Sequence, residues 1–344
     1  MSNRKQLGAL LLGTVLCGGA WAQQSGSSTV TITGKDSDGQ PVIKEVFRNL
    51  NAAAAAQLAS DLSGRLGFGE NISVAGRGRD FGTGNAAASG GNRWNLWAAA
   101  SYNRTGSSFQ PLQTSGNIGV LTAGLDYRVN DKLLVGAALA GERSRISLNY
   151  VAGGNLAGDG LTVVPYAAYV FNRAWAVDGS FGYGRSSYDI SGGGATGSFR
   201  GTRTFGNVAL NYRQEIAGSR WLVTGRGALM SLSSRTGSFT ASNNAFSDST
   251  SSDLTQLRLS GQMSYAAGQV TPYFGLTYVY DIRRPGSVTV GGQTSSGDRD
   301  AWVPTIGLRF SSGGSVYGGL QLSTERGRSE VKNDQLLFNL GLRF

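Results

Sequence analysis

The chain has 344 residues, of which 40% are hydrophobic, and carries a formal net charge of +10. No run of about 18 apolar residues follows the N-terminal region, which excludes a membrane-spanning helix there. The 53 glycines against 6 prolines disfavour a proline-rich disordered chain and suit close-packed strands with tight turns. Lysines and arginines are spread singly rather than clustered, so no nucleic-acid partner is expected.

Residues 1–22 have the parts of a secretory signal peptide. A positive start precedes an apolar stretch over 7–16, and Ala20-Trp21-Ala22 is a cleavage motif. We predict cleavage between Ala22 and Gln23, which removes Cys17, the single cysteine. The mature chain would then hold no disulfide and no thiolate metal site. A lipoprotein anchored at Cys17 is the alternative, but the residues before it make a poor lipobox.

Residues 23–44 form a short segment that could make one hairpin around 36–39. The run Asp36-Ser37-Asp38-Gly39 has the opening of a calcium loop. Position 12 of that loop would be Phe47, where a bidentate glutamate is required. A β-turn explains the run better, so we expect neither a metal nor a cofactor.

Residues 45–66 are predicted to form an amphipathic helix. Its apolar positions at helical spacing are Phe47, Leu50, Ala54, Leu58, Leu62 and Leu66. Small alanines over 52–56 would let such a helix occupy a narrow space. Residues 67–91 are rich in glycine and polar side chains, which suits a flexible link.

From residue 92 to residue 344 the sequence alternates apolar with small or polar side chains, as strands with one oily and one wet face do. Residues 336–344 show the pattern most clearly, with leucine or phenylalanine at every even position. The predicted strands are 93–104, 118–130, 132–149, 160–172, 174–190, 199–216, 219–235, 253–268, 270–283, 299–312, 315–327 and 331–344. An even number of strands allows antiparallel closure, so we predict an all-β, 12-stranded antiparallel transmembrane barrel.

A soluble β-sandwich would also alternate, but its strands usually have about five or six residues. The predicted strands are two to three times longer, and crossing a bilayer takes roughly 9 to 11 residues. Aromatic residues gather near the ends of the oily faces, as in interfacial girdles. The pairs are Trp94 and Tyr102, Trp175 and Tyr183, and Trp302 and Phe310. These features favour the membrane barrel.

The predicted connections alternate between long and short, as expected for surface loops and periplasmic turns. The long ones are 105–117, 150–159, 191–198, 236–252 and 284–298, while the outer connection at 328–330 is a short exception. The short ones are 130–131, 172–173, 217–218, 268–269 and 313–314. Both ends of the barrel then lie on the periplasmic side.

Charged residues on the polar face are predicted to point into the lumen, because an arginine facing mid-bilayer lipid costs roughly 2 to 4 kcal/mol. The predicted lumen-facing residues are Asp126, Arg128, Glu142, Asp178, Arg213, Arg226, Arg258, Asp281, Arg283, Arg309 and Arg343. We favour ion pairs between these side chains across the lumen as their role. Contact with a plug helix and selectivity for anions are the alternatives.

The sequence contains no histidine, which excludes a Ser-His-Asp triad and a His-ligated metal. We therefore expect no catalytic residues and no enzyme.

The run LTAGLDYRVNDKLLVGAALAGERSRISL at 121–148 and the terminus LGLRF at 340–344 resemble the autotransporter β-domain, the translocator of type V secretion. The resemblance covers about residues 90–344. It implies a 12-stranded barrel with a helix in its lumen, here 45–66, and a C-terminal assembly signal at Phe344. The alternative places this helix outside the pore. Residues 49–51, Asn-Leu-Asn, lack the Asn-Asn pair at which some members cut themselves, so self-cleavage is not expected.

The resemblance implies a translocator that anchors, and helps to export, an N-terminal segment across the bacterial outer membrane. The sequence departs from the family pattern in its passenger, the exported N-terminal part. Only about 22 residues, 23–44, lie between the signal peptide and the helix. The alternatives are an outer-membrane pore and a surface-loop adhesin without an exported passenger. Expected partners are outer-membrane lipid, lipopolysaccharide and the outer-membrane assembly machinery, with the barrel a monomer.

Overall fold

The computed structural model describes residues 93–110, 112–284, 289–290, 292–312 and 315–344. The proposed signal peptide, the 23–44 segment, the 45–66 helix and the 67–91 linker lie outside the described residues. None of the described residues forms a helix that could span a membrane.

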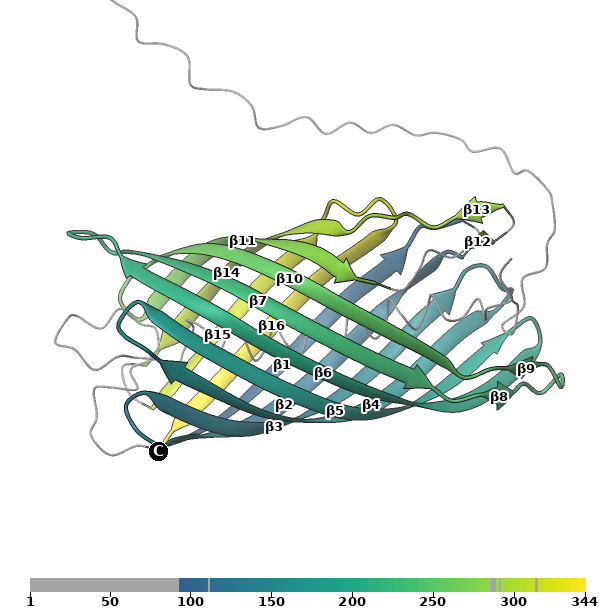
Figure 1. Ribbon diagram of the computed structural model, residues 1–344, viewed down its shortest axis with the longest axis horizontal. Helices are drawn as coiled ribbons and strands as arrows, with labels where there is room; N and C mark the ends of the chain where they lie inside the picture. The colour runs from purple at the N-terminus through teal and green to yellow at the C-terminus, as the bar shows by residue number, and fades with distance from the viewer. Residues whose placement is uncertain (1–92, 111, 285–288, 291, 313–314) are drawn as a thin grey trace, which may run out of the picture.

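Twelve long strands close into one antiparallel barrel, which confirms the predicted fold (Figure 1). Around the barrel the order is β1-β16-β15-β14-β11-β10-β7-β6-β5-β4-β3-β2, so every connection joins neighbours and β1 pairs with β16. The barrel strands are β1 (Trp94–Ser107), β2 (Thr114–Arg128), β3 (Leu133–Leu148), β4 (Gly154–Val170), β5 (Trp175–Gly192), β6 (Ala195–Glu215), β7 (Trp221–Thr236), β10 (Thr250–Tyr265), β11 (Val270–Arg283), β14 (Asp300–Ser311), β15 (Val316–Glu325) and β16 (Val331–Arg343). Closure leaves no strand edge unpaired, as a barrel in lipid requires.

Two small hairpins extend from the loops at one end of the barrel. They are formed by β8 (Phe239–Thr240) with β9 (Phe246–Ser247), and by β12 (Thr289–Val290) with β13 (Gln293–Thr294). Both lie at the same end in Figure 1.

The longest connections lie at one end of the barrel, although that end also has short turns. Those at one end span 129–132, 171–174, 216–220, 266–269 and 312–315. Those at the other end span 108–113, 149–153, 193–194, 237–249, 284–299 and 326–330. Because outer-membrane barrels have short periplasmic turns and longer outer loops, we call these the periplasmic and the outer end. β1 begins and β16 ends at the periplasmic end.

Two predicted long loops are largely strand. β4 begins at Gly154, inside the predicted loop 150–159, and β5 and β6 almost meet within the predicted loop 191–198. Gly193 and Gly194 close that hairpin with φ angles of 60° and 80°, as a two-residue turn with both central residues left-handed requires. The glycines and serines that suggested loops form ladder hydrogen bonds here, because the neighbouring strand supplies partners whatever the side chain.

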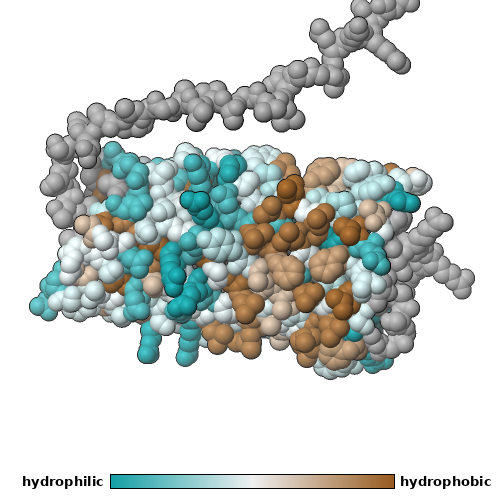
Figure 2. All heavy atoms as spheres, turned by 180° about the vertical axis from the view of Figure 1, so that it is seen from behind, coloured by the Kyte–Doolittle hydropathy of each residue, from teal (hydrophilic) through white to brown (hydrophobic). Residues whose placement is uncertain are grey.

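The outward face of the barrel is apolar over its periplasmic half, with exposed fractions of 64% at Leu121, 61% at Val208 and 60% at Ile306. Paired aromatic rings mark its borders, with centroids 4.7 Å apart for Trp94–Tyr127 and 4.9 Å apart for Trp175–Tyr212 at the periplasmic end. Figure 2 shows the hydrophobic band on one half of the barrel and hydrophilic side chains on the other. This arrangement suits a wall that crosses a bilayer and continues beyond it.

Aromatic side chains on the inner face lie over glycines of the neighbouring strand. Trp97 is paired with Gly124, and a Cβ at Gly124 would lie 2.5 Å from the indole ring. The other register pairs of this kind are Gly136–Tyr166, Gly158–Tyr188, Gly182–Phe205, Gly307–Tyr273 and Gly341–Tyr317. Each glycine leaves the space that a ring fills, which explains part of the high glycine content.

The main apolar cluster lines the inner face from Trp97 in the periplasmic half to Phe239 at the outer end. Tyr188 stacks on Phe199 at 5.3 Å, and Phe199 stacks on Phe239 of the β8–β9 hairpin at 4.9 Å. A second cluster joins three loops at the mouth through Phe109, Leu112 and Val290, with Tyr150 packed against it. Loops from different hairpins therefore pack together above the membrane.

Candidate functional site: the barrel lumen

The inner face is identified by contacts between strands that are not neighbours in the barrel. Trp97 of β1 meets Tyr166 of β4, and Glu142 of β3 meets Arg203 of β6. In each case two strands lie between the partners, so the contact crosses the inside of the barrel. The buried positions alternate with the lipid-facing ones along every strand.

All but one of the residues predicted to face the lumen lie on this inner face. They are Asp126, Arg128, Glu142, Asp178, Arg213, Arg226, Arg258, Asp281, Arg309 and Arg343.

Arg283 does not follow the prediction. The ladder between β10 and β11 pairs Gln256 with Asp281 but Thr255 with Arg283, so the register shifts by one residue. Such a β-bulge turns the following side chain to the other face. Arg283 is 72% exposed on the outer surface, 3.5 Å from the Asp253 carboxylate.

The first polar cluster lies in the periplasmic half and centres on the Asp126 carboxylate. Asn95 Nδ2 donates to it at 2.6 Å and Trp97 Nε1 at 3.2 Å. The Tyr166 hydroxyl also donates to Asp126 and accepts from Trp97 Nε1 at 2.8 Å. Tyr317 of β15 donates to Asn95 Oδ1 at 2.8 Å, which links this cluster across the β1–β16 closure. Four strands are thereby tied through one carboxylate and one amide.

A second cluster joins β5, β6 and β7. Arg226 binds Asp178 through both terminal nitrogens, at 2.6 and 3.1 Å. Asn211 between them donates to Asp178 at 2.7 Å and accepts from Arg226 at 2.6 Å. The two charged side chains are 12% and 1% exposed, so this is a buried, fully hydrogen-bonded ion pair of the strong bidentate kind.

The third cluster spans the lumen from β3 to β6. Arg203 binds Glu142 at 2.6 Å and 3.4 Å and donates to the Thr162 hydroxyl at 3.1 Å. The arginine and glutamate side chains are 4% and 9% exposed. Because β4 and β5 separate these strands, the pair acts as a strut across one side of the lumen.

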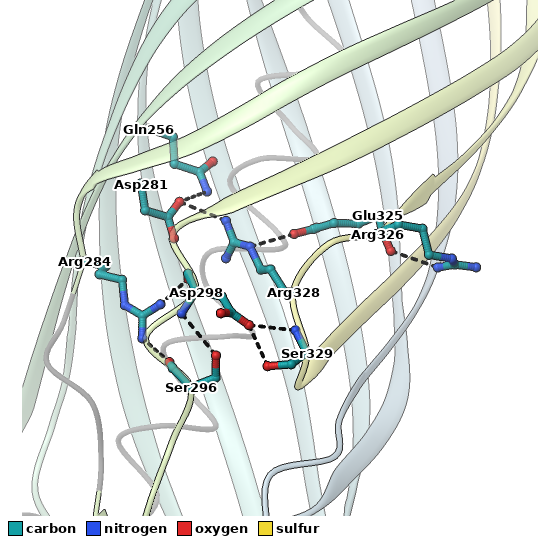
Figure 3. A network of polar contacts seen from close by, with 9 residues as sticks. All are labelled: Gln256, Asp281, Arg284, Ser296, Asp298, Glu325, Arg326, Arg328 and Ser329. Carbon is teal, nitrogen blue, oxygen red and sulfur yellow. Dashed lines mark hydrogen bonds and ion pairs between the residues drawn. The ribbon is translucent and has the colours of Figure 1, made fainter.

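The fourth cluster lies at the outer mouth (Figure 3). Asp281 accepts from Gln256 at 2.8 Å and from Arg328 at 3.0 Å. Arg328 also lies 3.1 Å from the Glu325 carboxylate. The turn 326–330 is thus held against β10 and β11.

Asp298 fixes the long 284–299 loop to the same turn. Its carboxylate accepts from the Ser329 amide at 2.8 Å and from the Ser329 hydroxyl at 2.6 Å, and Arg284 binds the main-chain oxygens of Asp298 and Ser296 (Figure 3). Hydrogen bonds from Ser296 and Ser329 lower the pKa of Asp298 to about 2, because they favour the charged carboxylate.

Two further lumen arginines lie over aromatic rings. The Arg309 guanidinium is 4.2 Å from the Tyr273 ring centroid, and that of Arg343 is 4.4 Å from the Tyr317 centroid, within the range of a cation–π contact. Arg258 makes no ion pair with any described residue. The lumen wall therefore offers guanidinium, carboxylate, amide and phenol groups.

The sequence analysis missed Arg203, the partner of Glu142, and the neutral partners of the predicted charges. Asn95, Trp97 and Tyr166 share the inner phase of their strands, and this phase was the available signal. Arg328 and Glu325 lie at or beyond the end of β15, where alternation carries little information. Which inward side chains contact one another depends on the tilt of the strands and on how the barrel closes.

The lumen lining presents hydrogen-bonding groups of both kinds, donors and acceptors. The described residues contain no group of three or more acidic, histidine or cysteine side chains that could hold a metal ion. The acidic groups are engaged by arginine or amide donors. Groups of these types can hydrogen-bond polar side chains and main-chain amides.

The family described as Autotransporter beta-domain matches residues 96–323. No match was found among curated proteins. The translocator domain of autotransporter NalP from Neisseria meningitidis is similar in structure, with a TM-score of 0.67 at 15% identity, covering 86% of this chain and 99% of that one.

Two other solved structures share the fold. The beta domain of the Bordetella autotransporter BrkA gives a TM-score of 0.61 at 18% identity, covering 74% of this chain and 100% of that one. The transport unit of the autotransporter AIDA-I from Escherichia coli gives a TM-score of 0.54 at 12% identity. The match covers 86% of this chain and 99% of that one. The family match spans most of the barrel, and the barrel has the strand number and closure of these translocators. The chain belongs to the autotransporter β-domain family and is an outer-membrane translocator barrel.

Proposed function

We propose that this barrel anchors the chain in the outer membrane and that residues 23–44 reach the cell surface through its lumen, with residues 45–66 remaining inside as a helix. The single observation that carries the proposal is the position of Trp94, the first residue of β1, at the periplasmic end of a closed barrel. A chain that enters a closed barrel from this end has the lumen as its direct route to the surface.

The length and composition of 45–66 support this assignment. A helix over these residues would be about 33 Å long at about 1.5 Å per residue, close to the roughly 30 Å of a bilayer core. The alanines at 52–56 would give the middle of such a helix a small diameter. The polar clusters on the wall would face it with donors and acceptors, whereas lipid outside the barrel would not.

We further propose that the barrel is not an enzyme and does not cut its own helix. The sequence has no histidine, and residues 49–51 lack the adjacent asparagine pair. The family fold is that of a transporter.

An epitope inserted at Ser27 tests export directly. In intact cells it should bind antibody as well as the same epitope placed between Asn243 and Asn244, in the β8–β9 hairpin at the outer end. The matched negative control carries it between Asn172 and Arg173, in a periplasmic turn. Export is refuted when the Ser27 epitope behaves like the periplasmic control and is detected only after the outer membrane is permeabilised.

Deletion of residues 23–91 separates a translocator from an open pore. If the helix occupies the lumen, the deleted protein should fold and conduct ions much better than the full mature chain in a planar bilayer. Equal conductance would favour a pore without an inserted segment. Heat-modifiable gel mobility serves as the check that both proteins are folded.

A further inference from the structure

Positive side chains gather on the outer wall where the apolar band ends at strands β16, β1, β2 and β3. Tyr102 is the last apolar residue that faces outward on β1, and Arg104 follows it on the same face. On β3 the outward positions beyond Leu139 include Arg143 and Arg145. Figure 2 shows hydrophilic side chains projecting from the wall beyond the hydrophobic band.

The register places three of these cations around small polar residues. Arg104 is paired with Asn117, and Asn117 is paired with Arg145. Lys332 is paired with Gly106, two residues beyond Arg104 on the same face. Directly opposite residues lie about 5 Å apart, so Arg104 and Arg145 flank Asn117, while Lys332 lies beside Arg104 on β16. We call Arg104, Arg145 and Lys332 the basic cluster.

Two carboxylates lie near the basic cluster, and Asp334 is paired with Arg104 in the β1–β16 register. Asp159 lies 3.4 Å from Arg143, and Asp334 accepts from Arg326 at 3.3 Å and from Thr324. Among the residues that the structure describes, none forms an ion pair with a member of the basic cluster. The three positive charges of the basic cluster outnumber the single carboxylate of Asp334, so the cluster keeps a net positive charge that a bound anion would offset.

The surroundings of the basic cluster indicate which anion fits. The cluster lies at the outer end of the apolar band, and the leucines nearest to it on the periplasmic side, Leu121 and Leu139, are 64% and 55% exposed to lipid. Guanidinium groups bind phosphate oxygens through two parallel hydrogen bonds. A ligand with phosphate above and acyl chains below would satisfy both surfaces at once.

We propose that the basic cluster binds the phosphate groups of an outer-leaflet glycolipid of the lipid A type, with its acyl chains lying on Leu121 and Leu139. This site lies outside the lumen, so it is independent of the export proposed above. The bound lipid would hold the barrel in one rotational orientation relative to the surrounding lipids. It would also bring negative charge to the β1–β16 closure.

Native mass spectrometry of the full mature protein in detergent tests the proposal. The probe is bisphosphorylated lipid A, and the comparison lipid is the same glycolipid without phosphates. The variant Arg104→Gln/Arg145→Gln/Lys332→Gln should bind the phosphorylated lipid at least about tenfold more weakly, since each surface cation near anionic lipid contributes about 1 kcal/mol. The matched control, Lys132→Gln/Arg173→Gln/Arg220→Gln, removes the same charge from periplasmic turns and should bind as the wild type does.

Three results would overturn the site. The first is an equal loss of lipid binding in the two triple variants. The second is equal binding of phosphorylated and unphosphorylated lipid by the wild type. The third is full displacement of the bound lipid by millimolar inorganic phosphate, which would indicate a simple anion site. Gel mobility before and after heating shows whether each variant is folded. The variant Arg104→Lys/Arg145→Lys keeps the charge but loses the parallel guanidinium hydrogen bonds, so it should bind the phosphorylated lipid more weakly than the wild type and more tightly than the glutamine variant. It also keeps the test open if the glutamine variant misfolds.

Discussion

Replacing Arg203 by methionine should destabilise the barrel strongly. The substitution leaves the Glu142 carboxylate, 9% exposed, without the guanidinium that lies 2.6 Å away. Two unit charges about 4 Å apart interact by about 4 kcal/mol at an effective dielectric constant of 20, and breaking one half of a buried pair typically costs about 3–5 kcal/mol. We therefore expect Arg203→Met to lower the free energy of unfolding by about 3–5 kcal/mol.

The chain offers a matched control at the residue next to Glu142. Arg143 of β3 lies 3.4 Å from Asp159 of β4, but the two side chains are 70% and 68% exposed. An exposed pair contributes about 0–1 kcal/mol, so Arg143→Met should change stability little. The double variant Glu142→Met/Arg203→Met removes both buried charges and should recover most of the loss, because a buried pair replaced by apolar side chains is often neutral.

The assay is urea unfolding of the mature protein in detergent micelles, followed by tryptophan fluorescence and by heat-modifiable gel mobility. Adding salt should leave the effect of Arg203→Met in place, since a pair so little exposed is weakly screened. A loss below about 1 kcal/mol for Arg203→Met, or a double variant worse than the single one, would show that Glu142 and Arg203 do not form the strut described above.

Three further outcomes follow from the structure. Gly124→Ala places a Cβ 2.5 Å from the Trp97 ring and should cost about 1–3 kcal/mol by overpacking, whereas Gly141→Ala, with nothing within 4 Å of its Cβ, should be neutral in the same urea assay. Asp298 has its pKa lowered to about 2 by Ser296 and Ser329, so its contribution to loop docking should be complete above about pH 4 and should fade as the pH falls towards 2. Carboxyl ¹³C NMR should show this titration, and Ser329→Ala should move it towards the ordinary aspartate range; an unshifted curve would contradict the contacts in Figure 3. Deleting Phe344 should reduce the amount of barrel assembled in cells far more than refolding in detergent, and equal losses in both would contradict its role as an assembly signal.

Alternation along the chain was sufficient to predict the barrel, because a wall with lipid on one side and polar groups on the other must repeat every two residues. The strand predicted at 93–104 is observed at Trp94–Ser107, and that at 331–344 at Val331–Arg343. The predicted loops at 150–159 and 191–198 were largely wrong for a physical reason. Their glycines and serines have weak strand preference, yet each continues a ladder that the adjacent strand already holds in register.

The lumen could be predicted one residue at a time but not as pairs. Period two predicted the face of Glu142, whereas Arg203, on the inner phase of β6, was not predicted. The two residues are 61 positions apart in the chain, and nothing in either local sequence indicates that they meet. Their contact depends on strand tilt and on the curvature set by closure. Arg283 shows the complementary failure, because one shifted register position reverses a face.

The cross-lumen contacts also limit what this barrel can pass. Glu142–Arg203 joins β3 to β6, Trp97–Tyr166 joins β1 to β4, and Tyr273 donates to Gln321 of β15 at 3.0 Å from β11, across β14. Links between strands that are not neighbours resist flattening or widening of the wall. Barrels of about eight strands are filled by their own side chains, while those of about 16 to 18 hold an aqueous channel. A 12-stranded barrel lies between these sizes, so we expect its lumen to admit one helix or an extended segment. We therefore predict that an exported segment crosses unfolded or as a single helix, and that a folded domain forms only outside.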